Sequence, residues 1–220
     1  MYLPEAFKED RIPVLHELIR SAGLATLVSM TADGLIASHT PLLLDPDPAP
    51  FGRLVGHLAK ANPHARAADP SVPTLAIFHG PNGYITPSYY AAKREHGKVV
   101  PTWNYAAIHA YGTLDVIDDP ATLHDLVRRL TDRHETPRAQ PWALSDAPDD
   151  YVNGMLRGIV GFSLTITRLE GKVKMSQNRP ATDHAGIIEG LRADGHAALA
   201  QAVAQATSPL PVQTDAPKKA

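Results

Sequence analysis

Cysteine is absent from this chain of 220 residues. Without thiols the protein can form neither disulfide bonds nor thiolate zinc sites, and thiol catalysis is excluded as well. Eleven histidines remain as candidate metal ligands. Four of them fall on predicted strands: His39, His57, His79 and His109. Their spacing matches neither HExxH nor a facial triad, so we predict no metal site.

The chain also lacks a long apolar run and an excess of positive charge. No stretch is long enough to cross a bilayer, and the opening MYLPEAFKEDR has acidic residues and a proline where a signal peptide needs basic and then apolar residues. We therefore expect a cytoplasmic protein without membrane contact. The net charge of −2 gives nucleic acid no overall attraction, so a DNA-binding role requires a local basic patch or a partner protein.

Several signatures of nucleotide and acyl chemistry are missing too. The chain has no Gly-rich P-loop and no GxGxxG spacing, which argues against nucleoside triphosphates and Rossmann dinucleotides. It has no G-x-S-x-G elbow, and chance Ser-His-Asp combinations are easy to assemble from eleven histidines. We therefore predict no catalytic residue.

What the chain does contain is a series of β-strand patterns. Apolar and β-branched residues at 24–31 and 35–44 flank Ala32-Asp33-Gly34, which predicts a hairpin. Further strands are expected at 53–58, 74–79, 107–117 and 162–167, the last joined by a hairpin at Glu170-Gly171 to 173–175. Residues 81–87 are expected to form a wide connection and residues 91–97 a mobile segment.

Helices are predicted between and after these strands, at about 10–23, 62–69, 119–135, 146–158, 180–192 and 197–206. Because hairpin-linked strands dominate the first two thirds, we predict a mainly β fold, an antiparallel barrel with peripheral and C-terminal helices. Residues 1–206 are expected to form a single domain. Residues 207–220, with three prolines and no periodicity, are expected to be a disordered tail.

The segment KVVPTWNY, residues 98–105, has the most distinctive composition. Trp103 and Tyr105 flank Asn104 directly after Pro101, a residue that disfavours helix. Two aromatic rings around an amide suit a flat aromatic ligand, but they suit packing or a subunit contact equally well. Both interpretations stay open on residue types alone.

A second candidate site lies in GHLAKANP, residues 56–63. Asn62 and Pro63 predict the N-cap and first residue of a helix, and Lys60 stands just before them. Free N–H groups at such a helix start, together with a lysine, form a plausible cradle for a phosphate. Asn-Pro caps without any ligand are also common.

Two further polar stretches interrupt apolar surroundings. Ser38-His39-Thr40-Pro41 places hydroxyls and an imidazole on a strand where a barrel interior is expected, and buried polar groups need partners from the backbone or from a ligand. KMSQNRP, residues 174–180, leaves a strand with a dense run of donors. Such a run can close over an anionic or heteroaromatic ligand, or it can cap the final helices.

Taken together and in order, seven segments resemble the PaiB family, whose members are described as FMN-binding negative transcriptional regulators. The resemblance covers Met1 to about Arg192 and implies a split β-barrel related to pyridoxamine-phosphate oxidase, assembled as a homodimer with FMN at the subunit interface. The segments are MYLPEAF, SHTPLLLD, GHLAKANPH, IFHGPNGYITPSYY, VPTWNY with HAYGTL, DDYVNGMLRGIVGF and ITRLEGKVKMSQNRP.

The resemblance also implies roles for individual side chains. The isoalloxazine ring would be lined by one strand and its neighbour: His39, Thr40, Pro41 and Leu42, with His57 and Leu58. Lys60 and Asn62 would face the phosphate. Trp103 and Asn104 would come from the other subunit or form the outer wall of the same site, and Ser176, Gln177 and Arg179 would close it.

The leading hypothesis is therefore an FMN-binding or flavin-responsive negative transcriptional regulator rather than an enzyme. No helix-turn-helix with a basic recognition helix is evident, so direct operator binding does not follow from the residues, and repression could act through a partner or a metabolite. The alternative is a flavin-dependent oxidoreductase, or a haem-binding split-barrel enzyme, acting on a small molecule. A missing catalytic triad is no objection to that alternative, because the flavin itself supplies the redox chemistry.

Overall fold

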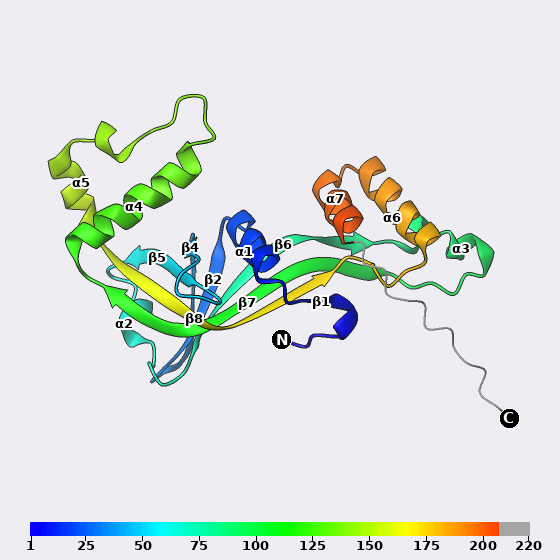
Figure 1. Ribbon diagram of the computed structural model, residues 1–220, viewed down its shortest axis with the longest axis horizontal. Helices are drawn as coiled ribbons and strands as arrows, with labels where there is room; N and C mark the ends of the chain where they lie inside the picture. The colour runs from blue at the N-terminus through cyan, green and yellow to red at the C-terminus, as the bar shows by residue number, and fades with distance from the viewer. Residues whose placement is uncertain (207–220) are drawn as a thin grey trace. The chain divides into compact units, whose positions relative to one another are not determined.

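The computed structural model describes residues 1–206, so the predicted tail at 207–220 lies outside the described residues. Eight strands form one sheet in the order β3-β2-β6-β7-β8-β5-β4, with β1 paired to β8. The pairs β2–β3, β2–β6, β4–β5 and β5–β8 are all antiparallel. The mainly β, antiparallel fold with peripheral helices is therefore confirmed (Figure 1).

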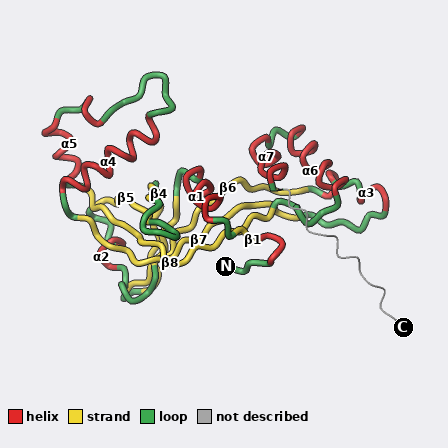
Figure 2. Tube along the Cα trace, in the orientation of Figure 1, coloured by secondary structure: helices red, strands yellow, loops and turns green. Residues whose placement is uncertain are grey.

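The strands are β1 (Lys8–Glu9), β2 (Ala25–Thr31), β3 (Gly34–Thr40), β4 (Leu43–Asp45), β5 (Arg53–Ala59), β6 (Thr74–Ile85), β7 (Thr102–Ile117) and β8 (Ile159–Lys174). The α-helices are α1 (Ile12–Ser21), α2 (His64–Ala67), α3 (Ala92–Glu95), α4 (Pro120–Glu135), α5 (Asp149–Leu156), α6 (Ala181–Ala193) and α7 (Ala197–Gln205). Three 3-10 turns lie at Glu5–Phe7, Pro87–Tyr89 and Leu144–Asp146. Figure 2 shows how these helices and strands follow one another along the chain.

The chain divides into two compact units, and the boundary crosses the three longest strands. One unit comprises Asp10–His79 and Ala107–Gly171, and we call it the barrel unit. The other comprises Met1–Glu9, Gly80–Ala106 and residues 172–206, and we call it the helical unit. Strands β6, β7 and β8 each contribute one end to each unit.

The barrel unit closes where β3 approaches β5. The Thr40 hydroxyl at the end of β3 donates to the backbone oxygen of His57 on β5, at 2.9 Å. The interior of the barrel unit is an apolar cluster to which α1 adds Leu15 and Ile19. Helix α4 begins at the Asp119 cap, whose carboxylate accepts from the Thr122 N–H at 2.8 Å, and it buries one apolar stripe beside β4 and β5.

The helical unit is a layer of strand ends with helices on one face. Alternate residues of β6, β7 and the segment after β8 point into a core that they share with α6 and α7, as the period of two along a strand requires. Figure 1 shows α6 and α7 side by side over these strand ends. The residues between them alternate to the other face, where Tyr84 and Trp103 are exposed.

Four predicted elements were wrong in detail. The strand expected at 35–44 breaks at Pro41, because proline has no N–H for the ladder, and Leu43–Asp45 pairs with β5 instead. Strand β6 continues through 81–85, within the segment 81–87 where a wide connection was expected. Pro81 is tolerated there because β2 pairs only with residues 75–78 of β6.

The other two differences concern residues 170–171 and 91–97. Strand β8 runs without interruption from 159 to 174, so the hairpin expected at Glu170-Gly171 does not form, and Gly171 is buried within the strand. The segment expected to be mobile contains the short helix α3, whose Ala92 N–H donates to the Asp183 carboxylate at 2.9 Å.

Candidate functional site

The end of β3 alternates between buried and exposed side chains. Ser38 and Thr40 are buried, whereas His39 is exposed and its Nδ1 lies 3.0 Å from the Thr26 hydroxyl on β2. Strand pleating explains the alternation, because neighbouring residues point to opposite faces. The SHTP segment therefore presents one imidazole outward and uses its hydroxyls within the barrel unit.

The neighbouring predicted ring contacts lie mostly inside the core. Leu42 is 8% exposed and Leu58 is 6% exposed, and both belong to the barrel's apolar cluster, while Pro41 is half-buried. A ring bound at this end could touch only the small remaining surface of the two leucines. The accessible polar groups here are His39 and the half-buried His57.

His57 carries an unsatisfied polar atom. Its Nδ1 is buried and has no hydrogen-bond partner among residues 1–206. Burial lowers the pKa of His57, because desolvation disfavours the imidazolium. The ring therefore stays neutral near pH 7 and retains one nitrogen that could accept or donate a bond to a ligand.

The 59–64 turn differs from the predicted cradle of free N–H groups. The Lys60 N–H donates to Gly158 O and the Asn62 N–H to Ala59 O, both at 2.8 Å, so these two donors already have partners. Helix α2 begins at His64 and has only four residues. Pro63 and not Asn62 takes the N-cap position, so the predicted cap was wrong; the Asn62 Oδ1 instead accepts the His64 N–H at 3.0 Å and closes a local turn.

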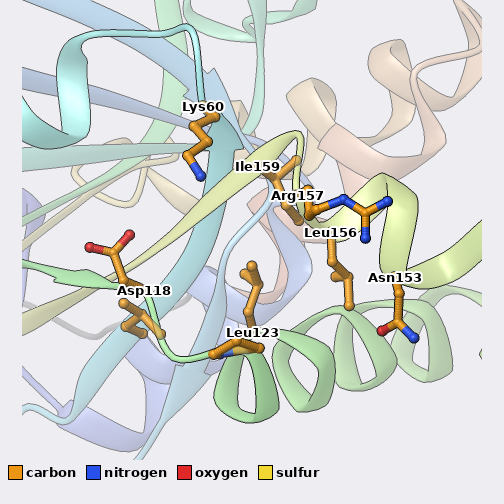
Figure 3. A pocket seen from close by; sticks show the side chains of 9 residues that line it. Lys60, Asp118, Leu123, Asn153, Leu156, Arg157 and Ile159 are labelled. Atoms are coloured by element: carbon orange, nitrogen blue, oxygen red, sulfur yellow. The ribbon is translucent and has the colours of Figure 1, made fainter. Parts of the chain in front are cut away.

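Lys60 enters a pocket of about 460 Å³ that the sequence did not predict. Figure 3 shows its amine pointing into this space, with Leu123 from α4 and Leu156 from α5 below it. Apolar side chains form much of the pocket wall, and Asp118 and Asn153 add polar groups. The full lining is Lys60, Ile117, Asp118, Pro120, Leu123, Asn153, Leu156, Arg157 and Ile159.

The charges around this pocket leave its cations available. Asp118 is paired with Arg66, whose Nη2 lies 2.5 Å from its carboxylate oxygen. Within the described part of the chain, neither Lys60 nor Arg157 forms an ion pair. Arg157 extends its guanidinium along α5, away from Lys60 (Figure 3). An apolar wall with two uncompensated cations suits an anion attached to an apolar body.

The other predicted residues belong to the helical unit. Asn104 is fully buried, and its Oδ1 accepts the Ser176 hydroxyl at 3.0 Å, while its Nδ2 has no partner among residues 1–206. Arg179 lies over the ring of Tyr90, with 4.9 Å between its Cζ and the ring centroid. Trp103 is exposed, and its indole N–H donates to Asn82 Oδ1 at 3.3 Å.

The KMSQNRP segment satisfies most of its donors internally. Lys174 donates to the Thr102 hydroxyl at 2.6 Å and to Trp103 O at 2.8 Å. Gln177 accepts from Met175 N at 2.7 Å and donates to Val173 O at 2.5 Å. These bonds tie the segment to β7 and β8, and α6 has no side-chain cap, so capping of the final helices by this run is not observed, and closure over a ligand stays a prediction.

The predicted site residues thus fall into two groups, eight in the barrel unit and five in the helical unit. The structure adds four residues that the prediction missed: His64, Asp118, Asn153 and Arg157. Asn153 and Arg157 lie in DDYVNGMLRGIVGF, a segment used for the family resemblance without any role assigned to it. Their convergence with Lys60 depends on the Lys60 N–H to Gly158 O bond, which no local pattern reveals.

Comparison with known proteins agrees with this architecture. A family model described as "Putative FMN-binding domain" matches residues 1–168. The Bacillus subtilis protein named protease synthase and sporulation protein PAI 2 is 31% identical over 192 residues, covering 87% of this chain and 89% of its own length. An uncharacterised protein of Emericella nidulans is 36% identical over 225 residues, covering 86% and 90%.

A solved structure with 19% identity supports the fold alone. It is the FAD and haem binding protein of Mycobacterium smegmatis, with a TM-score of 0.52 over 76% of this chain and 73% of that one. None of the helices in residues 1–206 has the length and apolar character needed to cross a membrane. On its sequence match and its split-barrel fold, this chain belongs to the FMN-binding domain family that includes PAI 2.

Proposed function

We propose that the chain binds FMN at the barrel unit, with the phosphate held by Lys60 at the pocket of Figure 3 and the isoalloxazine ring toward His39 and His57. The observation that carries this proposal is the Lys60 side chain. It is an exposed cation without an ionic partner among the described residues, and it points into a pocket with an apolar wall. A phosphate bound there would gain charge-assisted hydrogen bonds.

The residues present fit the chemical groups of FMN. Lys60 matches the phosphate, the apolar lining matches uncharged parts of the ligand, and the unpartnered His57 Nδ1 can bond a ring heteroatom. Bound FMN would supply the redox chemistry, and the protein would supply binding, orientation and exclusion of water. The amide of Asn62, which holds two bonds within the chain, is assigned to shaping the turn.

A comparison of FMN with riboflavin tests the phosphate assignment, because riboflavin lacks only that group. Lys60→Ala should weaken FMN binding about tenfold or more, since one charge-assisted hydrogen bond contributes roughly 1.5–3 kcal/mol. Riboflavin affinity should change little. Lys98→Ala, at an exposed lysine of the other unit, is the matched control. Equal losses for both ligands would show that the phosphate binds elsewhere.

We further propose that FMN binding serves regulation of the PaiB type and that the chain acts as a homodimer. The relationship to PAI 2, a protein named for protease synthesis and sporulation, supports the regulatory part. The exposed Trp103 and Tyr84, whose rings lie 6.4 Å apart, support a subunit contact on the helical unit.

Two measurements separate regulation from catalysis. An electrophoretic shift with a promoter fragment at moderate salt should show binding above the non-specific background if the chain contacts DNA itself. Steady consumption of NAD(P)H by the FMN-loaded protein, with any acceptor, would favour the oxidoreductase instead. For the dimer, light scattering should show twice the chain mass for the wild type and a single chain mass for Trp103→Ala.

A further inference from the structure

His64 is the most deeply enclosed polar side chain of the barrel unit. It is the first residue of α2, and its side chain is 0% exposed. Its Nδ1 lies 2.9 Å from the Ser38 hydroxyl on β3, and its Nε2 lies 2.8 Å from the Ser29 hydroxyl on β2. One imidazole therefore links the turn after β5 to two strands of the barrel.

The neighbouring bonds indicate the direction of each hydrogen in this network. The Asn62 Nδ2 donates to the Ser38 Oγ at 3.0 Å, which leaves the Ser38 proton for His64 Nδ1. His64 then carries its own proton on Nε2 and donates to Ser29 Oγ, whose hydroxyl donates to Thr74 Oγ1 at 2.7 Å. Every hydrogen in this hydrogen-bond network has an acceptor only when the imidazole is neutral.

Burial lowers the pKa of His64, because desolvation disfavours the imidazolium, and within residues 1–206 its two ring nitrogens bond only the Ser38 and Ser29 hydroxyls. The nearby charged or titratable groups all have other partners. On α2, Arg66 is paired with Asp118; on β3, His39 bonds Thr26; after α2, Asp69 bonds Ser71. The facing groups on β2 and β6 are the hydroxyls of Ser29 and Thr74.

The same network reaches the proposed phosphate ligand. Asn62 is held at both ends of its amide, by Ser38 Oγ and by the His64 N–H, and it lies two residues after Lys60. The backbone of the turn is fixed independently by Lys60 N–H to Gly158 O. Loss of the imidazole would remove the bonds that tie His64 to Ser38 and Ser29, so the far end of the turn would lose its anchor while Lys60 stays held at the near end.

We propose that His64 is a positioning residue: its neutral imidazole, bridging Ser38 and Ser29, holds the 60–64 turn so that the Lys60 amine stays directed into the pocket. The identity of the ligand in this inference, FMN, rests on the proposed function. The geometry of the 60–64 turn does not depend on it. A properly held lysine binds more tightly, because less conformational entropy is lost when the phosphate arrives.

Two substitutions separate the two halves of the bridge. An Asn side chain places an amide near the position of Nδ1, so His64→Asn should keep the link to Ser38 and Asn62. A Gln side chain reaches the position of Nε2, so His64→Gln should keep only the link to Ser29. We expect His64→Gln to raise the FMN dissociation constant about tenfold and His64→Asn to raise it about threefold or less. His134→Gln, at an exposed histidine of α4, is the control.

The geometry is tested without any flavin by amide hydrogen exchange. In His64→Gln the Lys60 and Asn62 amides should exchange at least tenfold faster than in the wild type, while amides in the middle of β7 keep their protection. Nitrogen-15 spectra should show His64 still neutral, with its proton on Nε2, at a pH where an ordinary histidine is already protonated, because burial lowers its pKa. If His64→Gln fails to fold, Ser38→Ala removes the same anchor with the imidazole retained.

Unchanged exchange at Lys60 and Asn62 in both His64→Gln and Ser38→Ala, or a His64 ring that takes up its proton at the pH of an ordinary histidine, would overturn the proposal. Faster exchange together with unaltered FMN affinity would also overturn it, because the turn would then not position the ligand's lysine. If the wild type binds no FMN, the proposed function fails. The exchange and nitrogen-15 results would still decide whether His64 holds the turn.

Discussion

Gly190 of α6 packs directly against the ring of Tyr89. A Cβ added there would lie 2.1 Å from Tyr89 Cδ1, 2.4 Å from Cε1 and 2.7 Å from Cγ. The ring cannot simply swing away, since the Tyr89 hydroxyl donates to Asp194 Oδ2 at 2.5 Å. Burial, with a smaller effect of Asp194, raises the pKa of Tyr89 to about 12.

Two opposing effects decide the outcome of Gly190→Ala. Alanine is favoured over glycine inside a helix by about 1 kcal/mol. Forcing a methyl group into an occupied space costs about 1–3 kcal/mol, and displacing the ring also removes a hydrogen bond of roughly 1 kcal/mol. The steric and hydrogen-bond losses exceed the helix gain, so we expect the variant to lower the unfolding free energy by about 1–3 kcal/mol.

Gly154 of α5 provides a matched control, because an added Cβ would meet only Arg157 Nη2, at 3.6 Å. Gly154→Ala should therefore keep the helix gain and raise the unfolding free energy by up to about 1 kcal/mol. Urea unfolding measures both variants, and tyrosine absorbance against pH should show the Tyr89 ionisation returning toward 10 in Gly190→Ala alone. Equal stabilisation of both variants would refute the packing argument.

Three further predictions concern stability. The unfolding free energy should fall below about pH 6.5, because burial lowers the folded-state pKa of His57, His64 and His109. Below that pH the unfolded chain therefore binds more protons than the folded chain. Each of these histidines lowers the unfolding free energy by up to about 1.4 kcal/mol per pH unit, until the pH falls past its folded-state pKa. Urea unfolding at pH 7.5, 6.5 and 5.5 tests this, and a flat profile contradicts it. Thr40→Val removes the hydrogen bond that closes the barrel and should lower the unfolding free energy by about 1–2 kcal/mol. Thr113→Val, at an exposed threonine, should lower it much less. Equal losses in the two variants would contradict the role of Thr40 in closing the barrel. Ser176→Ala should be less stable than Ser176→Gly, because the backbone φ of 62° at this position favours glycine. Both variants lose the hydrogen bond to Asn104, so that loss cancels in the comparison. Thermal unfolding of the glycine variant at the lower temperature would argue against that backbone geometry.

Much of the fold could be predicted from local patterns. Helix α4 follows from Asp119, Pro120 and its apolar spacing, and the β2–β3 hairpin follows from Asp33-Gly34 between two apolar runs. Where prediction failed, a partner distant in sequence decides the local structure. Glu170-Gly171 has the composition of a turn, yet pairing with neighbouring strands carries β8 straight through it.

The candidate site likewise has a part that local sequence patterns predict and a part that depends on residues distant in the sequence. The sequence identified Lys60 and Asn62 as a unit, and the structure places the lysine in a pocket and the asparagine in the turn that supports it. The pocket's other walls come from 117–123 and 153–159, far along the chain, and a linear pattern does not indicate which helix faces a given turn. His64 was overlooked because its partners lie 26 and 35 residues before it.

The central claim is that this chain binds FMN through its phosphate at the barrel unit. Calorimetric titration of the purified protein with FMN and, separately, with riboflavin tests it most directly. The account predicts saturable binding of one FMN per chain, at least tenfold tighter than riboflavin, since a charge-assisted phosphate contact contributes roughly 1.5–3 kcal/mol. No saturable binding of FMN, or equal affinity for the two flavins, would contradict it.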